Sequence, residues 1–269
     1  ISPDGLSAVV QVEAASNEGT DLWLVDLATG LRTRFTFAPG DEVSAVWTPD
    51  GKSIIYAADY ENTHRIMEQP VEGQGGTAIL LDTPLGAYPT SVSASDGTLL
   101  FDFRREDGES EIRKISLSAL DAEPEVVVSI PEGSTGGGMY SPDGRWIAYH
   151  TVSAAGWDIF VMPAAGGARK WQVSTDGCVY PQWGPAGNKL WASRFSGDLR
   201  AYDVDGTGQT FRVGKFTEPV RVGPPDAEGR GFDVHPDGKR LLHAGTDPAF
   251  RAVVSYLHLV TDWPRGLAQ

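Results

Sequence analysis

Residues 43–57 of the chain read Val43-Ser-Ala-Val-Trp-Thr-Pro-Asp-Gly-Lys-Ser-Ile-Ile-Tyr-Ala57. Two apolar runs flank the tetrapeptide Thr48-Pro-Asp-Gly51. Proline presets φ at the first turn position, aspartate bonds the nearby backbone, and glycine accepts the positive φ with which the chain enters the next strand. We therefore predict a β-hairpin whose turn is this tetrapeptide.

The tetrapeptide recurs along the chain as an internal repeat. Full copies stand at Ser2–Gly5, Ser141–Gly144 and His235–Gly238, and degenerate copies stand at Ser95–Gly97 and Gly184–Gly187. The turn glycines are residues 5, 51, 97, 144, 187 and 238, so successive copies lie 46, 46, 47, 43 and 51 residues apart. That period is typical of four-stranded propeller blades.

Two further runs follow each hairpin. A third run alternates apolar and polar residues, as in Asp21–Asp26 and Trp157–Met162, and a fourth follows a glycine turn, as in Arg32–Thr36. The segment Glu111–Leu120 also fits a loose helical stripe, but the repeat register favours a strand. Aromatic residues precede four of the turns, and we expect them to pack between blades: Trp47, Tyr140, Trp183 and Phe232.

Four antiparallel strands cannot bury both faces alone, so neighbouring units must stack around an axis. The predicted fold is all-β, a six-bladed β-propeller of four-stranded antiparallel blades in a single domain, 1–269. Its units lie near residues 1–42, 43–87, 88–136, 137–178, 179–229 and 230–269.

We expect one incomplete blade at the seam of the ring. Residue 1 falls just before the first turn, and the last unit supplies only two further strands after Gly238. We therefore expect residues upstream of Ile1 in the native gene to fill the missing strand. The alternative is that the chain is a fragment without a function of its own.

The Ser-Pro-Asp-Gly hairpins and the Asp-x-Leu/Ile-aromatic strands resemble the WD-type repeat of TolB-like β-propellers. The ending Leu257-His-Leu-Val-Thr-Asp-Trp263 is similar to the closing strand of propellers carried C-terminally by bacterial serine/threonine kinases and signalling proteins, although Pro264–Leu267 departs from the acidic residues usual there. The resemblance implies a scaffold that binds a protein or peptide at the channel mouth, as the sensor or interaction module of a larger signalling or envelope protein.

Charge and composition limit the classes of partner that the chain can bind. The chain has 22 Lys and Arg against 36 Asp and Glu, a formal net charge of -14, so we expect no nucleic-acid partner. No apolar run is long enough to insert into a membrane. We expect a monomer, and we favour a periplasmic or other extracytoplasmic location over the cytoplasm.

The loops between second and third strands are the least repetitive segments, and we expect them to converge on one face. Arginine and aromatic side chains there suit a peptide interface, and arginine can clamp a carboxylate. Alternatively, each arginine pairs with Glu106, Asp107 or Asp198 nearby. The predicted partner-binding residues are Asp59, Tyr60, Arg104, Arg105, His150, Arg194, Phe195, His243 and Phe250.

We predict no catalytic residue, no metal site and no cofactor. The five histidines form no His-x-x-x-His or His-x-His pair, although a funnel could bring His150 and His243 together. Asp203–Gly208 echoes the start of a calcium loop but is read as a turn. Cys178 is expected to be a buried filler rather than a reactive thiol. The competing hypothesis is an enzyme, either a carbohydrate-active propeller or the gating propeller of a peptidase.

Overall fold

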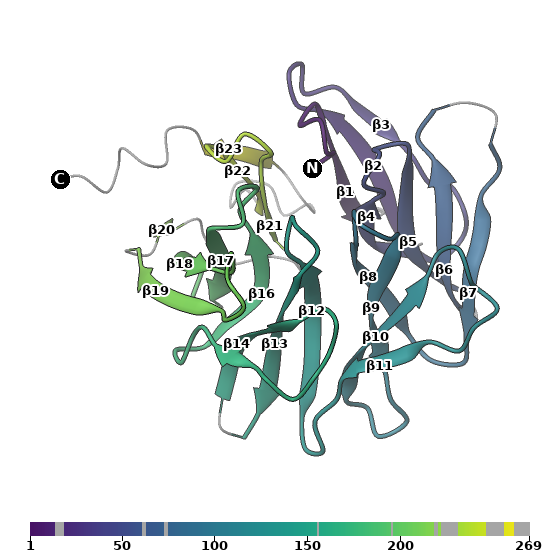
Figure 1. Ribbon diagram of the computed structural model, residues 1–269. Coiled ribbons are helices and arrows are strands. Elements are labelled where there is room, and N and C mark those ends of the chain that lie inside the picture. Colours follow the sequence, from purple (N-terminus) through teal and green to yellow (C-terminus); the bar gives the residue numbers. More distant parts are fainter. Residues whose placement is uncertain are drawn as a thin grey trace. The chain divides into compact units, whose positions relative to one another are not determined.

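The computed structural model describes residues 1–13, 19–60, 63–72, 75–154, 156–194, 196–217, 220–221, 231–245 and 256–260, and every regular element in these ranges is a β-strand (Figure 1). These residues include no helix that could cross a membrane. The chain divides into two compact units, Ile1–Val126 and Val127–Gln269.

Three antiparallel sheets make up the first unit, with β11 ending just past its boundary (Figure 1). Their strand orders are β1-β2-β3, β4-β5-β6-β7 and β11-β10-β9-β8. The strands are β1 (Ser7–Glu13), β2 (Thr20–Asp26), β3 (Arg32–Arg34), β4 (Asp41–Trp47), β5 (Ser53–Tyr60), β6 (Thr63–Pro70), β7 (Ala78–Thr83), β8 (Ala87–Val92), β9 (Thr98–Arg104), β10 (Ser110–Ser116) and β11 (Glu125–Val128). Within the segment Glu111–Leu120, which also fitted a helix, residues 111–116 belong to strand β10, as the repeat register predicted.

The second unit contains three more antiparallel sheets. Their orders are β12-β13-β14-β15, then β16-β17-β18-β19 with β20 also paired to β18, and β21-β22-β23. The strands are β12 (Ser134–Tyr140), β13 (Trp146–Ser153), β14 (Gly156–Pro163), β15 (Trp171–Gln172), β16 (Cys178–Trp183), β17 (Lys189–Arg194), β18 (Asp198–Asp205), β19 (Arg212–Phe216), β20 (Val220–Arg221), β21 (Phe232–Val234), β22 (Leu241–Gly245) and β23 (Tyr256–Val260).

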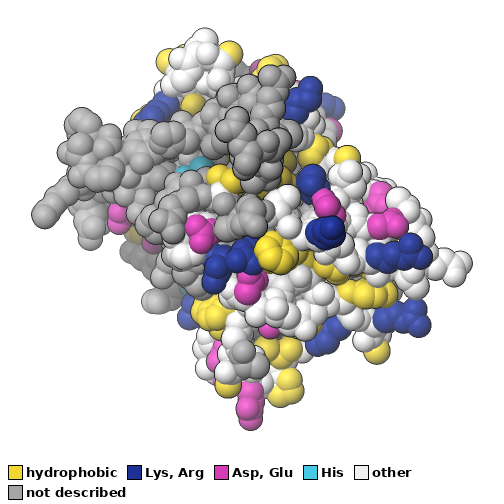
Figure 2. Space-filling view, turned by 90° about the vertical axis from the view of Figure 1, so that its left-hand side faces the viewer, with side chains coloured by type: hydrophobic (Ala, Val, Ile, Leu, Met, Phe, Trp, Pro, Cys, Tyr) yellow, Lys and Arg dark blue, Asp and Glu magenta, His cyan; other side chains and the backbone are white. Residues whose placement is uncertain are grey.

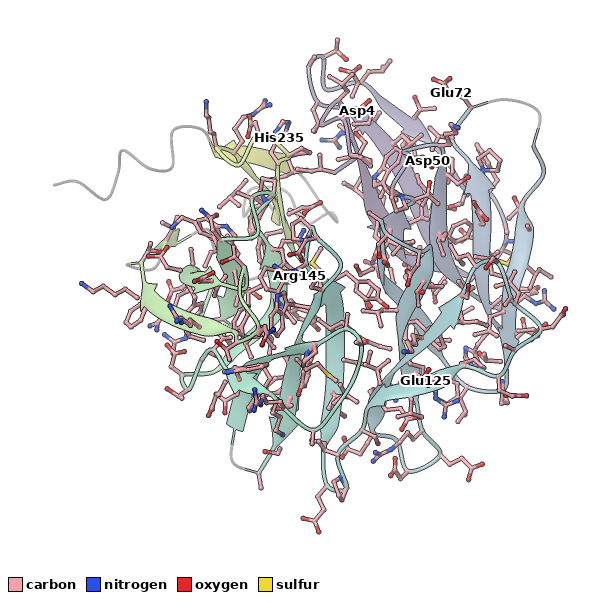
Figure 3. All side chains as sticks on the ribbon, in the orientation of Figure 1. Asp4, Asp50, Glu72, Glu125, Arg145 and His235 are labelled. Atoms are coloured by element: carbon pink, nitrogen blue, oxygen red, sulfur yellow. The ribbon has the colours of Figure 1, made fainter. Side chains whose placement is uncertain are left out.

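The predicted hairpin turns are confirmed, and their hydrogen bonds explain the sequence. The Thr48 hydroxyl donates to Asp50 Oδ1 at 2.8 Å and accepts the Ser53 N–H at 3.0 Å. Gly51 has a φ of 71° and its N–H donates to the Thr48 carbonyl at 2.9 Å. The aspartates of two such turns, Asp4 and Asp50, lie at the same end of the first unit (Figure 3). All six turn glycines have a positive φ between 67° and 75°.

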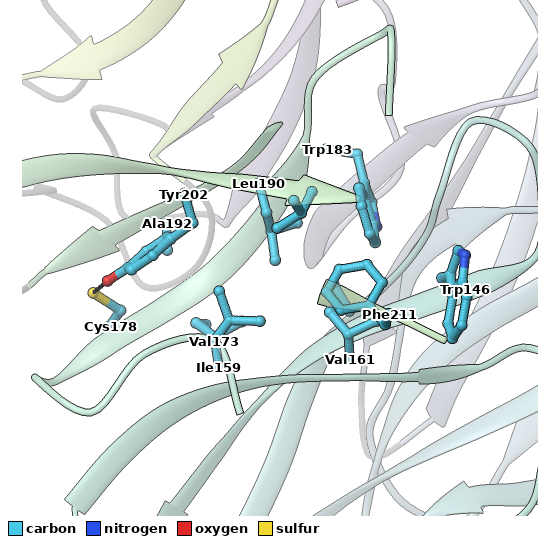
Figure 4. Close-up of a cluster of buried hydrophobic side chains, with 12 residues drawn as sticks. Trp146, Ile159, Val161, Val173, Cys178, Trp183, Leu190, Ala192, Tyr202 and Phe211 are labelled. Atoms are coloured by element: carbon cyan, nitrogen blue, oxygen red, sulfur yellow. Dashed lines mark hydrogen bonds between the residues drawn. The ribbon is translucent and has the colours of Figure 1, made fainter. Parts of the chain in front are cut away.

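The core of each unit lies between successive sheets. In the second unit, Trp146 and Val161 of one sheet pack with Trp183 and Leu190 of the next, and Phe211 fills the space between the two tryptophans (Figure 4). The Phe211 ring lies 5.2 Å from Trp146 and 6.0 Å from Trp183 between centroids. Fully burying a side chain of this size stabilises the fold by about 1.5–3 kcal/mol.

The same arrangement holds in the first unit. Ile55 and Ile66 pack against Leu99 and Phe101 of the neighbouring sheet. Trp47 packs against the cluster that joins the first two sheets, and Trp183 does so in the second unit. Phe232 packs in the same way against Trp191 and Leu199 of the sheet before it, so the predicted inter-sheet role is confirmed for Trp47, Trp183 and Phe232 and stays a prediction for Tyr140. On the face drawn in Figure 2, basic and acidic side chains lie among one another rather than separated by sign.

Candidate functional site

Bulges interrupt the first strands of several sheets at one repeat position. The strand register shifts between Val43 and Val46 in β4 and between Val179 and Gln182 in β16. Ser44 and Tyr180, the bulged residues, have φ values of 55° and 52°. Each lies seven residues before its turn glycine, as does Gly137 in β12, with a φ of 63°. Non-glycine residues pay of order 1–3 kcal/mol for such a conformation, so surrounding contacts must hold it.

A side chain from the preceding sheet supports each of these two bulges. The Ser44 N–H donates to Gln11 Oε1 at 2.9 Å, and the Tyr180 N–H donates to His150 Nδ1 at 3.4 Å. Gln11 and His150 occupy the same repeat position, six residues after a turn glycine. The bulge amide and its acceptor are therefore a second repeated device, linking neighbouring sheets.

His150 is 7% exposed, and its burial lowers its pKa to about 4. Because Nδ1 accepts a hydrogen bond, the neutral ring carries its hydrogen on Nε2. The Tyr180 ring packs edge-on against the imidazole with 5.0 Å between centroids. A Cβ at Gly137 would lie 2.9 Å from His150 Nδ1, so glycine is required there. These contacts give His150 a structural role, and its predicted partner binding stays a prediction.

A polar cluster stands at the end of β5 farthest from its turn, in the first unit. Asp59 Oδ1 lies 2.9 Å from His64 Nδ1, and Asp59 Oδ2 accepts the Tyr88 hydroxyl at 3.2 Å. Asp59 and His64 face one another in the β5–β6 hairpin, whereas Tyr88 comes from β8 of the neighbouring sheet. Burial and the Asp59 carboxylate raise the pKa of Tyr88.

The position of Tyr88 depends on Gly86. A Cβ on Gly86 would lie 2.6 Å from the Tyr88 hydroxyl oxygen, so any larger residue would displace the phenol. The Gly86 carbonyl accepts the Arg104 N–H at 2.8 Å, which places the end of β9 beside the same group. The positive charge of Arg104 opposes the rise in the pKa of Tyr88. We call Asp59, His64, Tyr88 and Arg104 the Asp59 cluster.

Arg104 and Arg105, two of the predicted binding residues, stand at the end of β9 and differ in their ion pairs. Arg105 pairs with Asp107 through two contacts, Nε to Oδ1 at 3.1 Å and Nη2 to Oδ2 at 2.7 Å. The alternative of local pairing is therefore confirmed for Arg105. Arg104 is exposed, and its guanidinium forms no ion pair with any residue that the structure describes. Arg104 is thus the arginine of this loop that can accept an external anion.

The structure brings Asp59 and Arg104 near Tyr88 in the first unit, whereas Tyr60, the next residue of β5, points to the opposite face of the strand. Tyr60, the last residue of β5, is 45% exposed and adjoins Asp59. Burial and Asp59 raise the pKa of Tyr88, and the charge of Arg104 opposes that rise. His64 was not predicted, because the sequence search looked for histidine pairs rather than for residues facing Asp59 across a tight hairpin. The five-residue separation of Asp59 and His64 around the hairpin was the available signal.

The remaining predicted residues belong to the second unit. Arg194 ends β17 opposite Cys178, and within the described ranges it has no ion pair. His243 lies on β22, 3% exposed, while His150 lies on β13 in a different sheet. Phe195 and Phe250 lie outside the described residues.

Metal binding and thiol chemistry are the two other kinds of site that the sequence raised. No group of three or more His, Cys, Asp or Glu side chains there could hold a metal ion. Cys178 is buried as predicted, with its Sγ 3.4 Å from the Tyr202 hydroxyl, and burial raises its pKa to about 11. A thiol with that pKa stays protonated near neutral pH, which makes it a poor nucleophile.

Comparisons with known proteins agree with this architecture. TolB from Acinetobacter baumannii has 17% identity and a TM-score of 0.73 over 95% of this chain and 60% of that chain, so the present chain spans 60% of that relative's length. A TolB candidate from Agrobacterium tumefaciens has 18% identity and a TM-score of 0.67, covering 96% of this chain and 88% of that one.

An oligogalacturonate lyase in complex with manganese is also similar, with 15% identity and a TM-score of 0.66 over 100% of this chain and 89% of that chain. No protein-family model matches the sequence, and no curated protein matches it significantly. The structural similarity extends over nearly the whole chain, and the strand pairing is that of antiparallel blades. The chain therefore has the TolB-like β-propeller fold, built from four-stranded antiparallel blades.

Proposed function

We propose that this chain is a non-enzymatic, six-bladed propeller that binds a protein or peptide partner at the end of the first unit formed by the Asp59 cluster and Tyr60. It acts as a monomeric sensor or interaction module of a larger bacterial signalling or envelope protein outside the cytoplasm. Partner binding by Arg194, Phe195, His243 and Phe250, which belong to the second unit, is proposed from the sequence alone.

One observation carries this proposal. Asp59 and Tyr60 come from one sheet and Arg104 from the next. Asp59 nevertheless accepts a hydrogen bond from the Tyr88 hydroxyl, and the charge of Arg104 lies close enough to oppose the burial-driven rise in the pKa of Tyr88. Tyrosine and arginine are enriched at protein interfaces, and the exposed Arg104, which has no ion pair among the described residues, lies near Tyr88. Loops presented by a rigid scaffold are also where binding residues concentrate.

Peptide binding is the direct test. We would probe an array of short peptides, varied in net charge and aromatic content, with the labelled chain and with the double variant Tyr60→Ala, Arg104→Ala. We expect a defined set of peptides to bind the wild-type chain and to lose binding in the double variant. Arg105→Ala is the matched control, because the Arg105 guanidinium is already bound to Asp107.

Two results would contradict the proposal: no peptide binding by a folded wild-type chain, or binding that survives in the double variant. Retained melting behaviour of each variant must accompany these results, so that a loss of binding is not a loss of fold.

A second candidate function, an enzyme, is favoured by the Asp59–His64 pair. A carboxylate that holds Nδ1–H leaves Nε2 able to accept a proton, which is the arrangement of a general base. One similar structure is an oligogalacturonate lyase. The test is incubation with oligogalacturonate and measurement of the unsaturated product by ultraviolet absorbance. Product formation that His64→Gln removes would support the enzyme, and no product would exclude this reaction.

A further inference from the structure

Strand β19 (Arg212–Phe216) forms the edge of its sheet in the second unit (Figure 1). It pairs with β18, and no residue that the structure describes pairs with its other edge. All five residues of β19 are exposed, including the apolar Val213 at 37% and Phe216 at 54%. An edge strand of this kind offers its backbone N–H and C=O groups to an added strand.

The charged residues of β19 differ from those of other edge strands in their ion pairing. In three other sheets, a charged residue of the edge strand forms an ion pair with the neighbouring strand. These pairs are Arg34–Asp21, Asp82–Arg65 and Glu125–Lys114, with N···O distances of 2.7, 3.0 and 3.2 Å. Arg212 and Lys215 of β19 form no ion pair with any described residue.

The carboxylates of β18 that lie nearest these two cations have other partners. Asp203 Oδ1 accepts from Lys189 Nζ at 2.7 Å. Asp205 stands opposite Arg212 in the register, but its Oδ1 accepts the Thr207 hydroxyl at 2.6 Å and the Thr207 N–H at 3.0 Å. The bonds from Thr207 lower the pKa of Asp205 more than the charge of Arg212 does. The cations of β19 therefore remain available to a carboxylate from outside the sheet.

The register separates the apolar and charged residues of β19 by face. The cross-strand pairs with β18 are Phe216–Tyr202, Val213–Val204 and Arg212–Asp205. Paired residues share a face, and successive residues of a strand alternate between faces. Val213 and Phe216 therefore lie on one face, and Arg212 lies on the other. A strand that alternates apolar and acidic residues would match β19 on both faces.

The Phe216 ring is held in place before any partner binds. The Arg200 guanidinium carbon lies 5.0 Å from the centroid of this ring, and the Tyr202 ring lies 6.1 Å away between centroids. Arg200 is itself ion-paired with Asp176. A ring that is already ordered loses little conformational entropy when a partner packs on it. Exposed aromatic and arginine side chains are also enriched at protein interfaces.

We propose that β19 binds an extended acidic segment of a protein partner, which adds to the sheet as a further strand. Its carboxylates pair with Arg212 and Lys215, and its apolar side chains contact Val213 and Phe216. A second copy of this chain suits the edge less well, because each copy carries a net charge of -14. This inference goes beyond the proposed function, since β19 belongs to a different unit from the Asp59 cluster.

The test uses three peptides: acidic acetyl-Glu-Val-Glu-Val-Glu-amide, neutral acetyl-Gln-Val-Gln-Val-Gln-amide, and the acidic peptide with every backbone nitrogen methylated. Each is titrated into the ¹⁵N-labelled chain while the backbone amide resonances are followed. We expect the acidic peptide to shift the amides of β19 and to slow their hydrogen exchange. The neutral peptide should bind about three- to tenfold more weakly, because two exposed ion pairs are lost. The methylated peptide should not bind, because it cannot donate backbone hydrogen bonds.

Variants locate the site. The double variant Arg212→Gln, Lys215→Gln should bind the acidic peptide no better than the neutral one. The matched control is Arg65→Gln, Lys114→Gln, which removes two cations that are already paired beside other edge strands. The control should bind the acidic peptide like the wild-type chain. Phe216→Ala should weaken binding of both peptides several-fold. Melting of each variant checks that the fold is retained.

Four results would overturn the inference: equal binding of the acidic and neutral peptides, undiminished binding of the methylated peptide, amide shifts that leave β19 unaffected, or equal weakening by the two double variants. Self-association that Phe216→Ala abolishes, with no peptide bound, would assign the edge to a second copy instead. Failure of the proposed function is distinguishable, because Tyr60→Ala, Arg104→Ala should not change binding at β19. Peptides that survive that variant but are lost in Arg212→Gln, Lys215→Gln would support the β19 site and contradict the site of the proposed function.

Discussion

The backbone N–H of Tyr180 donates a hydrogen bond to Nδ1 of His150, 3.4 Å away, and so ties the first strand of one sheet to the second strand of the sheet before it. The two residues are 30 positions apart in sequence. In the first unit, Gln11 Oε1 accepts the backbone N–H of Ser44 in the same way. A side-chain acceptor from the preceding sheet is thus what supports a non-glycine residue in the bulge conformation.

Two substitutions of His150 should separate the contribution of its hydrogen bond to stability from the contribution of its bulk. His150→Gln keeps an acceptor like that of Gln11, whereas His150→Leu removes the acceptor of this hydrogen bond. We expect His150→Leu to lower the free energy of unfolding by about 1–3 kcal/mol, and His150→Gln to cost less. Urea denaturation measures both. Equal stability of the two variants would show that the hydrogen bond contributes nothing.

The same histidine should make stability depend on pH. Burial lowers the pKa of His150 from its ordinary 6.5 to about 4, so between these values the unfolded chain binds a proton that the folded chain does not. Stability from this group is therefore full above pH 6.5 and is lost as pH falls toward 4, by roughly 3 kcal/mol in all. His150→Gln should remove this part of the dependence in melting curves taken from pH 4 to 7. An identical pH profile would refute the assignment.

Glu42 should make the stability of the fold depend on pH in the opposite direction. It is 1% exposed at the start of β4, and burial raises its pKa from 4.5 to about 7, with the Asp21 carboxylate adding to the rise and the Thr36 hydroxyl opposing it. Between these values the folded chain holds a proton that the unfolded chain has lost, so stability falls as pH rises, by up to roughly 3 kcal/mol.

Glu42→Gln removes the ionisable group while keeping its shape. We expect the variant to be more stable than the wild-type chain at pH 7 and little different at pH 4.5. Thermal melting at the two pH values makes the comparison, and a variant that is less stable at pH 7 would show that the ionised carboxylate is well compensated in the fold.

The repeated turn offers a test with an internal control. Gly51 has a φ of 71°, and a Cβ there would lie 3.6 Å from Pro3 of the preceding turn. Gly51→Val should destabilise the fold by about 1 kcal/mol or more, because a β-branched residue resists this backbone conformation. Gly144→Val should behave alike, with the same φ of 71°.

Gly76 is the control for these variants, since it has no positive φ and open space around its Cβ position. Gly76→Val should leave the melting temperature almost unchanged. Equal effects of all three substitutions would mean that side-chain bulk, and not the turn conformation, sets the cost.

The turns, the strand pattern and the repeat can all be predicted from the local sequence. These features are local: Thr48, Asp50 and Gly51 satisfy one another within four residues, so their identities predict the hairpin wherever they recur. The antiparallel four-strand unit follows from the spacing between such hairpins. Burial of Cys178 was likewise predictable from its place at the start of an apolar strand.

The contacts between side chains of different sheets could not be predicted in this way. Asp59 and Tyr88 are 29 positions apart and come together because adjacent sheets stack, and no local pattern encodes that contact. Arg104 and Arg105 are neighbours of the same type, yet one is paired with Asp107 and the other projects without an ion pair among the described residues. His150 was predicted at a binding surface and lies buried beneath a bulge. A turn's conformation depends on neighbouring residues in the sequence, whereas side-chain contacts between sheets depend on how whole blades pack.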